Sequence, residues 1–195
     1  MTVRKVLKYG TPSLREKSKE VHKISKKVQA LIEDLYDTMY ALNGVGLAAP
    51  QIGENLRVFV IDIGTDPKTM CPITFINPKI IKKEGAIISQ EGCLSFPDAY
   101  TEVRRYKSVK IKALNEKGKP FVLEVDDGSL LSRAIQHEYG HLDGVLFIDH
   151  CRNRFDADKV LTEKGLAPVD PAYLLEEKEL EEEIQKNPQQ QEEGK

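Results

Sequence analysis

One stretch, residues 128–144, constrains the fold more than any other part of the chain. It is predicted to be a helix, because residues 126–129 offer side chains that cap a helix start and a glycine closes the stretch. Within it His137 and His141 occur in the pattern His-Glu-x-x-His, so both rings lie on one helical face within reach of one metal ion. Glu138 falls on the neighbouring apolar stripe, where burial is expected to raise its pKa toward values useful for acid–base chemistry.

Two histidines are too few for a stable metal site, so the interpretation depends on a third ligand. Cys93, in the segment 91–95, is the best candidate, because a thiolate binds borderline divalent metals strongly and Gly92 allows close backbone approach. The other two cysteines, Cys71 and Cys151, lack such a setting and are interpreted as structural. Two imidazoles and one thiolate leave a fourth position open for water, which is the mark of a catalytic metal rather than a structural one.

Length and composition exclude several classes of protein. The chain has 195 residues, enough for one domain with a sizeable core. Its net charge of −2 does not indicate a nucleic-acid or membrane-surface binder. We find no apolar run long enough to cross a bilayer and no secretory signal at the start, and the three cysteines lack the spacing of a disulfide framework. We therefore expect a cytoplasmic protein without a membrane partner.

Charge is unevenly distributed along the chain. Residues 171–195 contain eight acidic and three basic side chains, a net charge of −5. Apolar residues between positions 173 and 184 could line one side of an acidic helix, although a solvated tail is the preferred interpretation. The sequence therefore predicts a catalytic domain over residues 1–170 and an acidic, partly disordered C-terminal extension over residues 171–195.

The middle of the chain has the character of a sheet protein. Short β-type runs alternate with turn sequences, a pattern typical of antiparallel pairing. The predicted strands are 57–63, 73–76, 79–83, 86–89, 102–106, 108–114 and 120–125, with a turn at Asn77-Pro78 and a further short strand at 145–148. Apolar residues at helical spacing predict an N-terminal amphipathic helix over 24–42. The order predicts an α+β fold, with antiparallel β-sheets packed around the histidine-bearing helix.

Three separate motifs together resemble the peptide deformylase family. They are Gly-Val-Gly-Leu-Ala-Ala-Pro-Gln at 44–51, Glu-Gly-Cys-Leu-Ser at 91–95 and Gln-His-Glu-Tyr-Gly-His-Leu-Asp-Gly at 136–144, in the order and spacing of that family. The segment 10–15 is also similar, and the resemblance covers about residues 3–150. Each motif alone is modest, but the three together are highly specific.

The resemblance implies a metal-dependent hydrolase that removes formate from the N-terminal formyl-methionine of newly made polypeptides. Cys93, His137 and His141 would hold the metal, which in this family is natively Fe²⁺, with Ni²⁺, Co²⁺ or Zn²⁺ able to replace it. The donor atoms by themselves would favour zinc. Glu138 would act as the general base toward water and later protonate the leaving amine.

The resemblance also implies the substrate contacts. The Gln51 amide and the backbone N–H of Leu94 would stabilise the oxyanion, and the peptide backbone would pair with the strand around Val45-Gly46. An ion pair between Glu91 and Arg105 would support the cysteine loop. The substrate-binding residues implied are Val45, Gly46, Glu91, Gly92, Leu130 and Ala134, the last two lining a pocket for the methionine side chain with His137.

Three features depart from the family pattern. Gly140 stands where the family usually has Asp, so a carboxylate that could tune the histidines is missing. Tyr100 stands where many bacterial members carry an Arg that contacts the peptide. Some members dock on the ribosome through a basic C-terminal helix, whereas this end is acidic, so any transient ribosome contact is expected to use another surface.

Two alternatives remain open from the sequence. A metzincin-type zinc protease needs a histidine where Phe147 stands. A thermolysin-like protease needs a downstream Glu ligand, for which Glu163 is a candidate without a supporting motif. A non-catalytic homologue could bind nascent peptides without hydrolysing them. The intact Glu138 argues against this second alternative, because a purely structural site needs no base.

Overall fold

The computed structural model describes residues 2–64 and 71–174. The helices are α1 (Lys26–Ala41), α2 (Leu130–Leu142) and α3 (Arg154–Glu163), with short 3-10 turns at Pro12–Arg15, Ala49–Ile52, Phe147–His150 and Pro171–Tyr173. The strands are β1 (Gly46–Ala48), β2 (Val58–Ile61), β3 (Ile73–Glu84), β4 (Ile87–Cys93), β5 (Phe96–Arg105), β6 (Ser108–Leu114) and β7 (Pro120–Val125). No helix in these ranges is long and apolar enough to cross a membrane.

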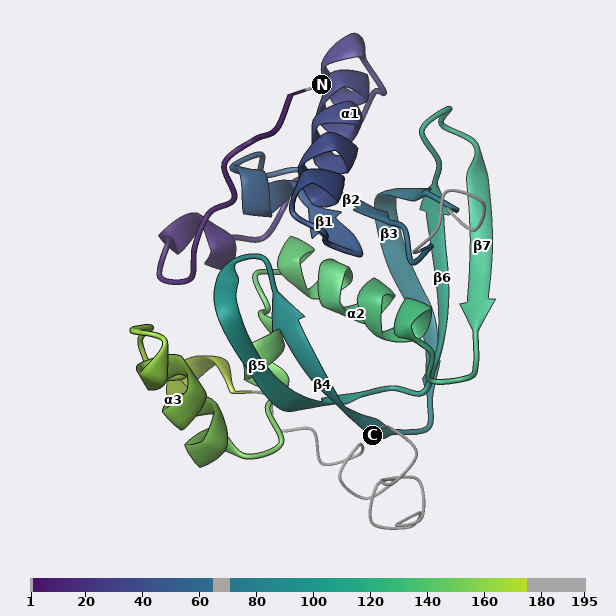
Figure 1. Ribbon diagram of the computed structural model, residues 1–195. Coiled ribbons are helices and arrows are strands. Elements are labelled where there is room, and N and C mark those ends of the chain that lie inside the picture. Colours follow the sequence, from purple (N-terminus) through teal and green to yellow (C-terminus); the bar gives the residue numbers. More distant parts are fainter. Residues whose placement is uncertain (1, 65–70, 175–195) are drawn as a thin grey trace.

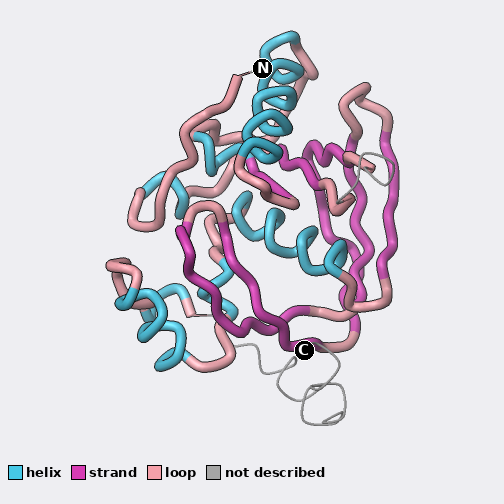
Figure 2. Tube along the Cα trace, in the orientation of Figure 1, coloured by secondary structure: helices cyan, strands magenta, loops and turns pink. Residues whose placement is uncertain are grey.

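The strands form two antiparallel sheets around one central helix. The larger sheet has the order β1-β2-β3-β6-β7, and β4 and β5 form a separate hairpin. Helix α2 lies between the larger sheet and the hairpin, with α1 packed beyond one of its ends (Figure 1). Figure 2 shows the same arrangement as one helix enclosed by strands. The predicted α+β class with a buried histidine-bearing helix is confirmed.

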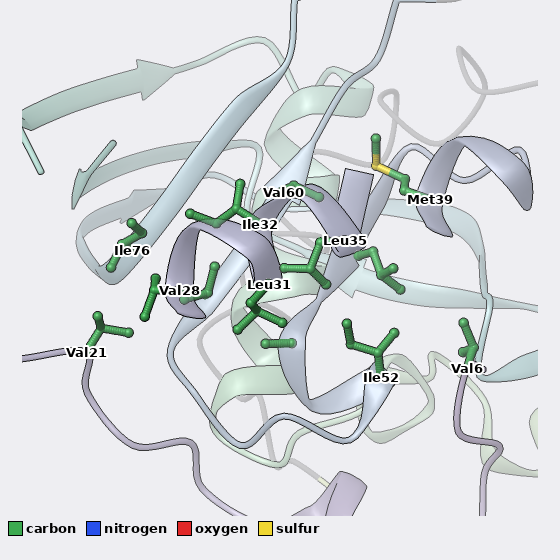
Figure 3. Packing of buried hydrophobic residues seen from close by; sticks show 13 residues of the cluster. Val6, Val21, Val28, Leu31, Ile32, Leu35, Met39, Ile52, Val60 and Ile76 are labelled. Atoms are coloured by element: carbon green, nitrogen blue, oxygen red, sulfur yellow. The ribbon is translucent and has the colours of Figure 1, made fainter. Parts of the chain in front are cut away.

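Helix α1 is amphipathic and covers one end of the larger sheet. The side chain of Ser25 accepts a hydrogen bond from the Val28 N–H and so caps the helix start. Leu31, Ile32 and Leu35 point from its apolar face into a cluster with Val60 of β2 (Figure 3). Burying such side chains contributes about 1.5–3 kcal/mol each, which fixes the helix against β1 and β2.

Helix α2 is held against the larger sheet by an apolar cluster. Ile135 and Leu142 are fully buried in it with Phe59 and Phe75, two rings that stack at 4.5 Å between centroids. A second cluster contains Phe96, Leu146 and Ile148 together with side chains of α3, but no residue of α2. It meets α2 where the Phe147 ring stacks on His137. The close packing against the sheet restricts the movement of the helix and of the side chains it carries.

The predicted turn at Asn77-Pro78 is wrong, because β3 runs through it as one strand. The register of β3 against β6 shifts between Ile76 and Lys79, which marks a β-bulge. Asn77 has a positive φ of 49°, and its side-chain amide makes hydrogen bonds with both the N–H and the C=O of Val21. A turn-type dipeptide therefore bends the strand without ending it.

Two other predictions at element level need correction, and one helix was missed. Residues 145–148 are not a strand, because a 3-10 turn forms at Phe147–His150 and Leu146, Phe147 and Ile148 pack into the second cluster. Strand β5 begins at Phe96 rather than at residue 102. Helix α3 was not predicted, since its apolar residues form no strong stripe. The part of the acidic extension beyond Leu174, predicted as a helix or a solvated tail, lies outside the described residues.

Candidate active site

A cavity of about 520 Å³ opens where β1, the β4–β5 hairpin and α2 meet. The site residues predicted from the sequence gather here, although they come from segments far apart in the chain. Those that line the cavity are Val45, Gly46, Gln51, Glu91, Gly92, Cys93, Leu94, Leu130, Ala134, His137 and Glu138. His141 lies beneath the surface at 1% exposure, in contact with Cys93.

Three potential metal ligands converge at this cavity. The donor atoms of Cys93, His137 and His141 all lie within 4.8 Å of one another, and the Cys93 Sγ is 3.3 Å from the His141 Nε2. Burial lowers the pKa of His141 well below its ordinary value, which keeps the ring neutral and its lone pair available. Burial also opposes charge on His137, but the neighbouring Cys93 and Glu91 raise the pKa of His137 well above its ordinary value. One sulfur and two imidazole nitrogens this close together are donors that suit a divalent metal.

Glu91 fixes the orientation of His137. Arg105 donates two hydrogen bonds to its carboxylate at 3.0 and 2.8 Å, so the predicted ion pair is present. The same carboxylate lies 3.0 Å from the His137 Nδ1, which leaves the Nε2 of that ring for a metal. Burial alone would raise the pKa of Glu91, but Arg105 and His137 outweigh it and hold the pKa well below its usual range. The ring of Phe147 stacks on His137 and fixes it further.

Glu138 presents a buried carboxylate toward the cavity. The residue is 5% exposed, and its Oε2 has no hydrogen-bond partner among the residues that the structure describes. Burial raises the pKa of Glu138 to about 7, despite the opposing charge of His137. A Cβ added to Gly46 would lie 2.6 Å from the Glu138 Oε1, so only glycine lets strand β1 pass this close. A buried carboxyl group with this pKa can both accept and donate a proton near neutral pH.

The Gln51 side chain is oriented by its surroundings. Its Oε1 accepts a hydrogen bond of 2.8 Å from the Ala48 N–H, which directs its amino group toward Cys93. That Nε2 lies 3.4 Å from the Cys93 Sγ and 3.3 Å from the Ser95 Oγ. The amide therefore offers a donor at the point where the cysteine loop and the cavity meet.

The model of the polypeptide deformylase family matches residues 3–156. The chain belongs to the peptide deformylase family. Peptide deformylase 1 of Clostridium acetobutylicum is 49% identical over 149 residues, which cover 76% of this chain and 95% of that relative. Peptide deformylase 1 of Bacillus subtilis is 42% identical over 165 residues, covering 85% of this chain and 100% of the relative.

Solved structures of peptide deformylases share the fold. The enzyme from Synechococcus elongatus, solved in complex with actinonin, superposes with a TM-score of 0.79 at 38% identity, covering 88% of this chain and 90% of that one. The enzyme from Legionella pneumophila superposes with a TM-score of 0.76 at 42% identity, covering 83% of this chain and 95% of that one. Membership in this family makes the chain a metal-dependent hydrolase.

The protease alternative finds no support in the peptide deformylase fold. Within residues 2–64 and 71–174, one group of side chains has metal-binding geometry, that of Cys93, His137 and His141. Glu163, the ligand that a thermolysin-like site would need, ends helix α3 and lies outside this group.

The two departures from the family motif occupy different places. Gly140 lies on a second cavity of about 190 Å³, away from the active-site cavity, and an added Cβ would meet the Val145 carbonyl at 3.0 Å. It supplies no carboxylate, and the His141 Nδ1 is buried without a partner among the described residues. Tyr100 is 57% exposed and lays its ring over Gly92 at the cavity wall.

Sequence reasoning missed several residues around the site. The N-terminal arm makes hydrogen bonds with the segments of Gln51 and Ser95: the Leu7 N–H donates to the Gln51 carbonyl at 2.8 Å, and the Tyr9 N–H to the Ser95 carbonyl at 2.9 Å. No local motif in the arm signals this. Arg133 also lines the cavity, and its spacing of one turn before His137 was a signal that could have found it. Further lining residues not predicted are Lys8, Leu42, Asn43, Gln90, Phe96, Pro97 and Asp98.

Proposed function

We propose that this cavity is the active site at which the peptide deformylase removes the formyl group from the N-terminal methionine of newly made polypeptides. The observation that carries the assignment is the buried carboxylate of Glu138, which lacks a partner among the described residues and adjoins the Cys93, His137 and His141 group. A structural metal site has no use for such a group.

Cys93, His137 and His141 would hold the metal, for which we propose Fe²⁺, with Ni²⁺, Co²⁺ or Zn²⁺ as substitutes. When bound, the metal supplies Lewis acidity, which polarises a carbonyl and makes water a nucleophile near neutral pH. The fixed tautomer of His137, set by Glu91, supports this ligand role because its Nδ1 is already engaged. A thiolate with two imidazoles leaves room for water and substrate.

Glu138 accepts a proton from the attacking water and returns it to the leaving amine as the formyl C–N bond breaks. Burial raises the pKa of Glu138 to about 7, which suits both halves of this exchange. The Gln51 Nε2 and the Leu94 N–H donate to the formyl oxygen as it gains negative charge. Gln51 is held for this task by the Ala48 N–H, so little reorganisation is needed.

Strand β1 supports a substrate-binding role for Val45 and Gly46. It is an edge strand of the larger sheet, so its outer side can pair with an extended peptide backbone. Gly92 of β4 also lines the cavity and offers its backbone to a peptide, while its missing side chain makes room for the Tyr100 ring. Leu130 and Ala134 provide apolar surface beside His137 for the methionine side chain.

We also propose that residues 1–170 form the catalytic unit and that the acidic residues 171–195 are an extension. The extension has a net charge of −5, which disfavours binding to ribosomal RNA because that RNA is a polyanion. A transient ribosome contact would therefore use another surface. A cytoplasmic location fits a substrate that emerges from the ribosome.

The deciding experiment measures anaerobic formate release from formyl-Met-Ala-Ser together with metal content, for the natural chain and Glu138→Ala. We expect turnover by the natural chain and, in the variant, retained metal with a rate lower by about 10²–10⁴-fold. If the natural chain holds metal but releases no formate, the protein would instead be a peptide-binding homologue. The first test would then be to replace Gly140 and Tyr100 by the Asp and Arg usual in the family.

A further inference from the structure

Arg133 is a charged residue in the cavity wall that the proposed reaction does not use. It lies on α2 one turn before His137, and its side chain lines the active-site cavity. Its Nε is buried and has no hydrogen-bond partner among the residues that the structure describes. No ion pair within residues 2–64 and 71–174 includes Arg133 either.

The lack of a partner for a buried guanidinium nitrogen sets Arg133 apart from the other arginines. The arginines with an acidic partner are Arg4, Arg15, Arg57, Arg105, Arg152 and Arg154. Arg104 donates to the backbone carbonyls of Cys151 and Arg152. A guanidinium has five N–H donors, and burying one without an acceptor costs about 1–3 kcal/mol. An oxygen acceptor that enters the cavity with a ligand would offset that cost.

The other cation in the cavity wall differs from Arg133. Lys8 also lines the cavity, but its ammonium group donates to the Leu94 carbonyl at 2.8 Å. Helical spacing puts Arg133 at the edge of the stripe that carries Leu130, Ala134 and His137. Its guanidinium therefore flanks the surface assigned to the methionine, where the following residues of a peptide would pass.

We propose that Arg133 is a specificity-determining residue that binds an oxygen of the peptide after the methionine, with a side-chain carboxylate as the preferred acceptor. The inference rests on the proposed function, because it takes the same cavity as the peptide site. A guanidinium matches a carboxylate in a two-pronged pair, which makes this contact stronger than one to a neutral carbonyl. Formylated peptides with Asp or Glu after methionine are then better substrates than those with Lys.

The test compares formyl-Met-Ala-Ser, formyl-Met-Glu-Ser and formyl-Met-Lys-Ser on the metal-loaded natural chain, Arg133→Met and Arg133→Lys. We expect Arg133→Met to lower kcat/KM for the Glu peptide by about 10-fold or more, mainly through KM. The Ala peptide should change by about twofold at most, and Arg133→Lys should restore part of the loss because it keeps the charge. Arg154→Met, the same change on the surface of α3, is the matched control and should alter none of the three.

Two results would overturn the proposal. Equal losses for all three peptides would assign the acceptor to the backbone and remove the carboxylate preference, and no change for any peptide would remove the contact altogether. Turnover of formyl-Met-Ala-Ser by the natural chain tests the proposed function separately. Calorimetry of the same peptides with Glu138→Ala, with and without Arg133→Met, measures the affinity that the contact contributes in the absence of turnover. Rising salt should weaken binding of the Glu peptide only when Arg133 is present.

Discussion

Single residues decide how close the reacting groups of this site can come. Gly46 brings the β1 backbone against the Glu138 carboxylate, and Glu91 holds His137 through its Nδ1. Each contact depends on the absence or presence of a few atoms rather than on overall packing. The chemistry is therefore expected to be more sensitive than the fold to substitution at these positions.

The substitution Gly46→Ala tests this at the base. The new Cβ would meet the Glu138 Oε1 at 2.6 Å and its Cγ at 2.9 Å, so the carboxylate must shift. Because a displacement of about 1 Å can cost about 10²-fold in rate, we expect kcat to fall by that order. Metal content should be unchanged, since no ligand is touched. A variant with full activity would show that the base does not need this position.

At the scale of elements, the site depends on how helices and strands are tied together. Helix α2 is fixed by the apolar cluster that joins it to the larger sheet, whereas α1 is also tied to the end of β2 by a polar contact. The Tyr40 hydroxyl donates to the Asp62 carboxylate at 2.7 Å, and the N–H groups of Gly64 and Cys71 donate to its other oxygen. Asp62 thus joins three segments behind β1.

Acid should weaken this junction. Burial raises the pKa of Asp62, but the three hydrogen bonds outweigh it and lower the pKa below its ordinary value of 3.8. A folded-state pKa below the unfolded one means that the stabilisation is complete above about pH 4 and is lost as the pH falls. We expect Asp62→Asn to lower the free energy of unfolding by about 1–3 kcal/mol at pH 7.

The measurement is urea unfolding of both chains from pH 7 to pH 2.5. The difference between them should shrink as the pH falls, because protonation removes the charge from the natural chain. A difference that stays constant across this range would mean that the carboxylate charge does not contribute.

At the scale of the whole molecule, the described chain completes its core at the start of the acidic extension. Val169 is 1% exposed and packs in the second cluster, and Leu174 rests against the same cluster. All residues that line the candidate cavity lie between Lys8 and Glu138. We therefore expect the segment up to about residue 174 to contribute to stability rather than to the proposed chemistry.

Truncation separates these two roles. A chain that ends after Leu174 should release formate within about twofold of the full chain and unfold at nearly the same temperature. A chain that ends after Glu163 loses Leu166 and Val169 from the second cluster and should be less stable by about 2–4 kcal/mol. If the chain that ends after Leu174 retained its metal but lost activity, the acidic extension would have a part in catalysis.

The sequence by itself predicted the residues of the candidate site, because they occur in short motifs. Helical spacing placed His137 and His141 on one face, and residue type singled out Cys93, whose donor atom the structure brings within 4.8 Å of theirs. Alternation of apolar and polar residues likewise predicted β6 and β7 to the residue. These features are local, so no knowledge of the folded chain was needed.

Only the tertiary structure decided what depends on contacts between distant segments. The dipeptide at Asn77-Pro78 reads as a turn, but pairing with β6 and bonds to Val21 carry the strand through it. Residues 145–148 have strand character, yet packing beside α3 winds them into a 3-10 turn. The isolation of Arg133 is also a property of its surroundings, because a list of residues does not reveal which charge lacks a partner.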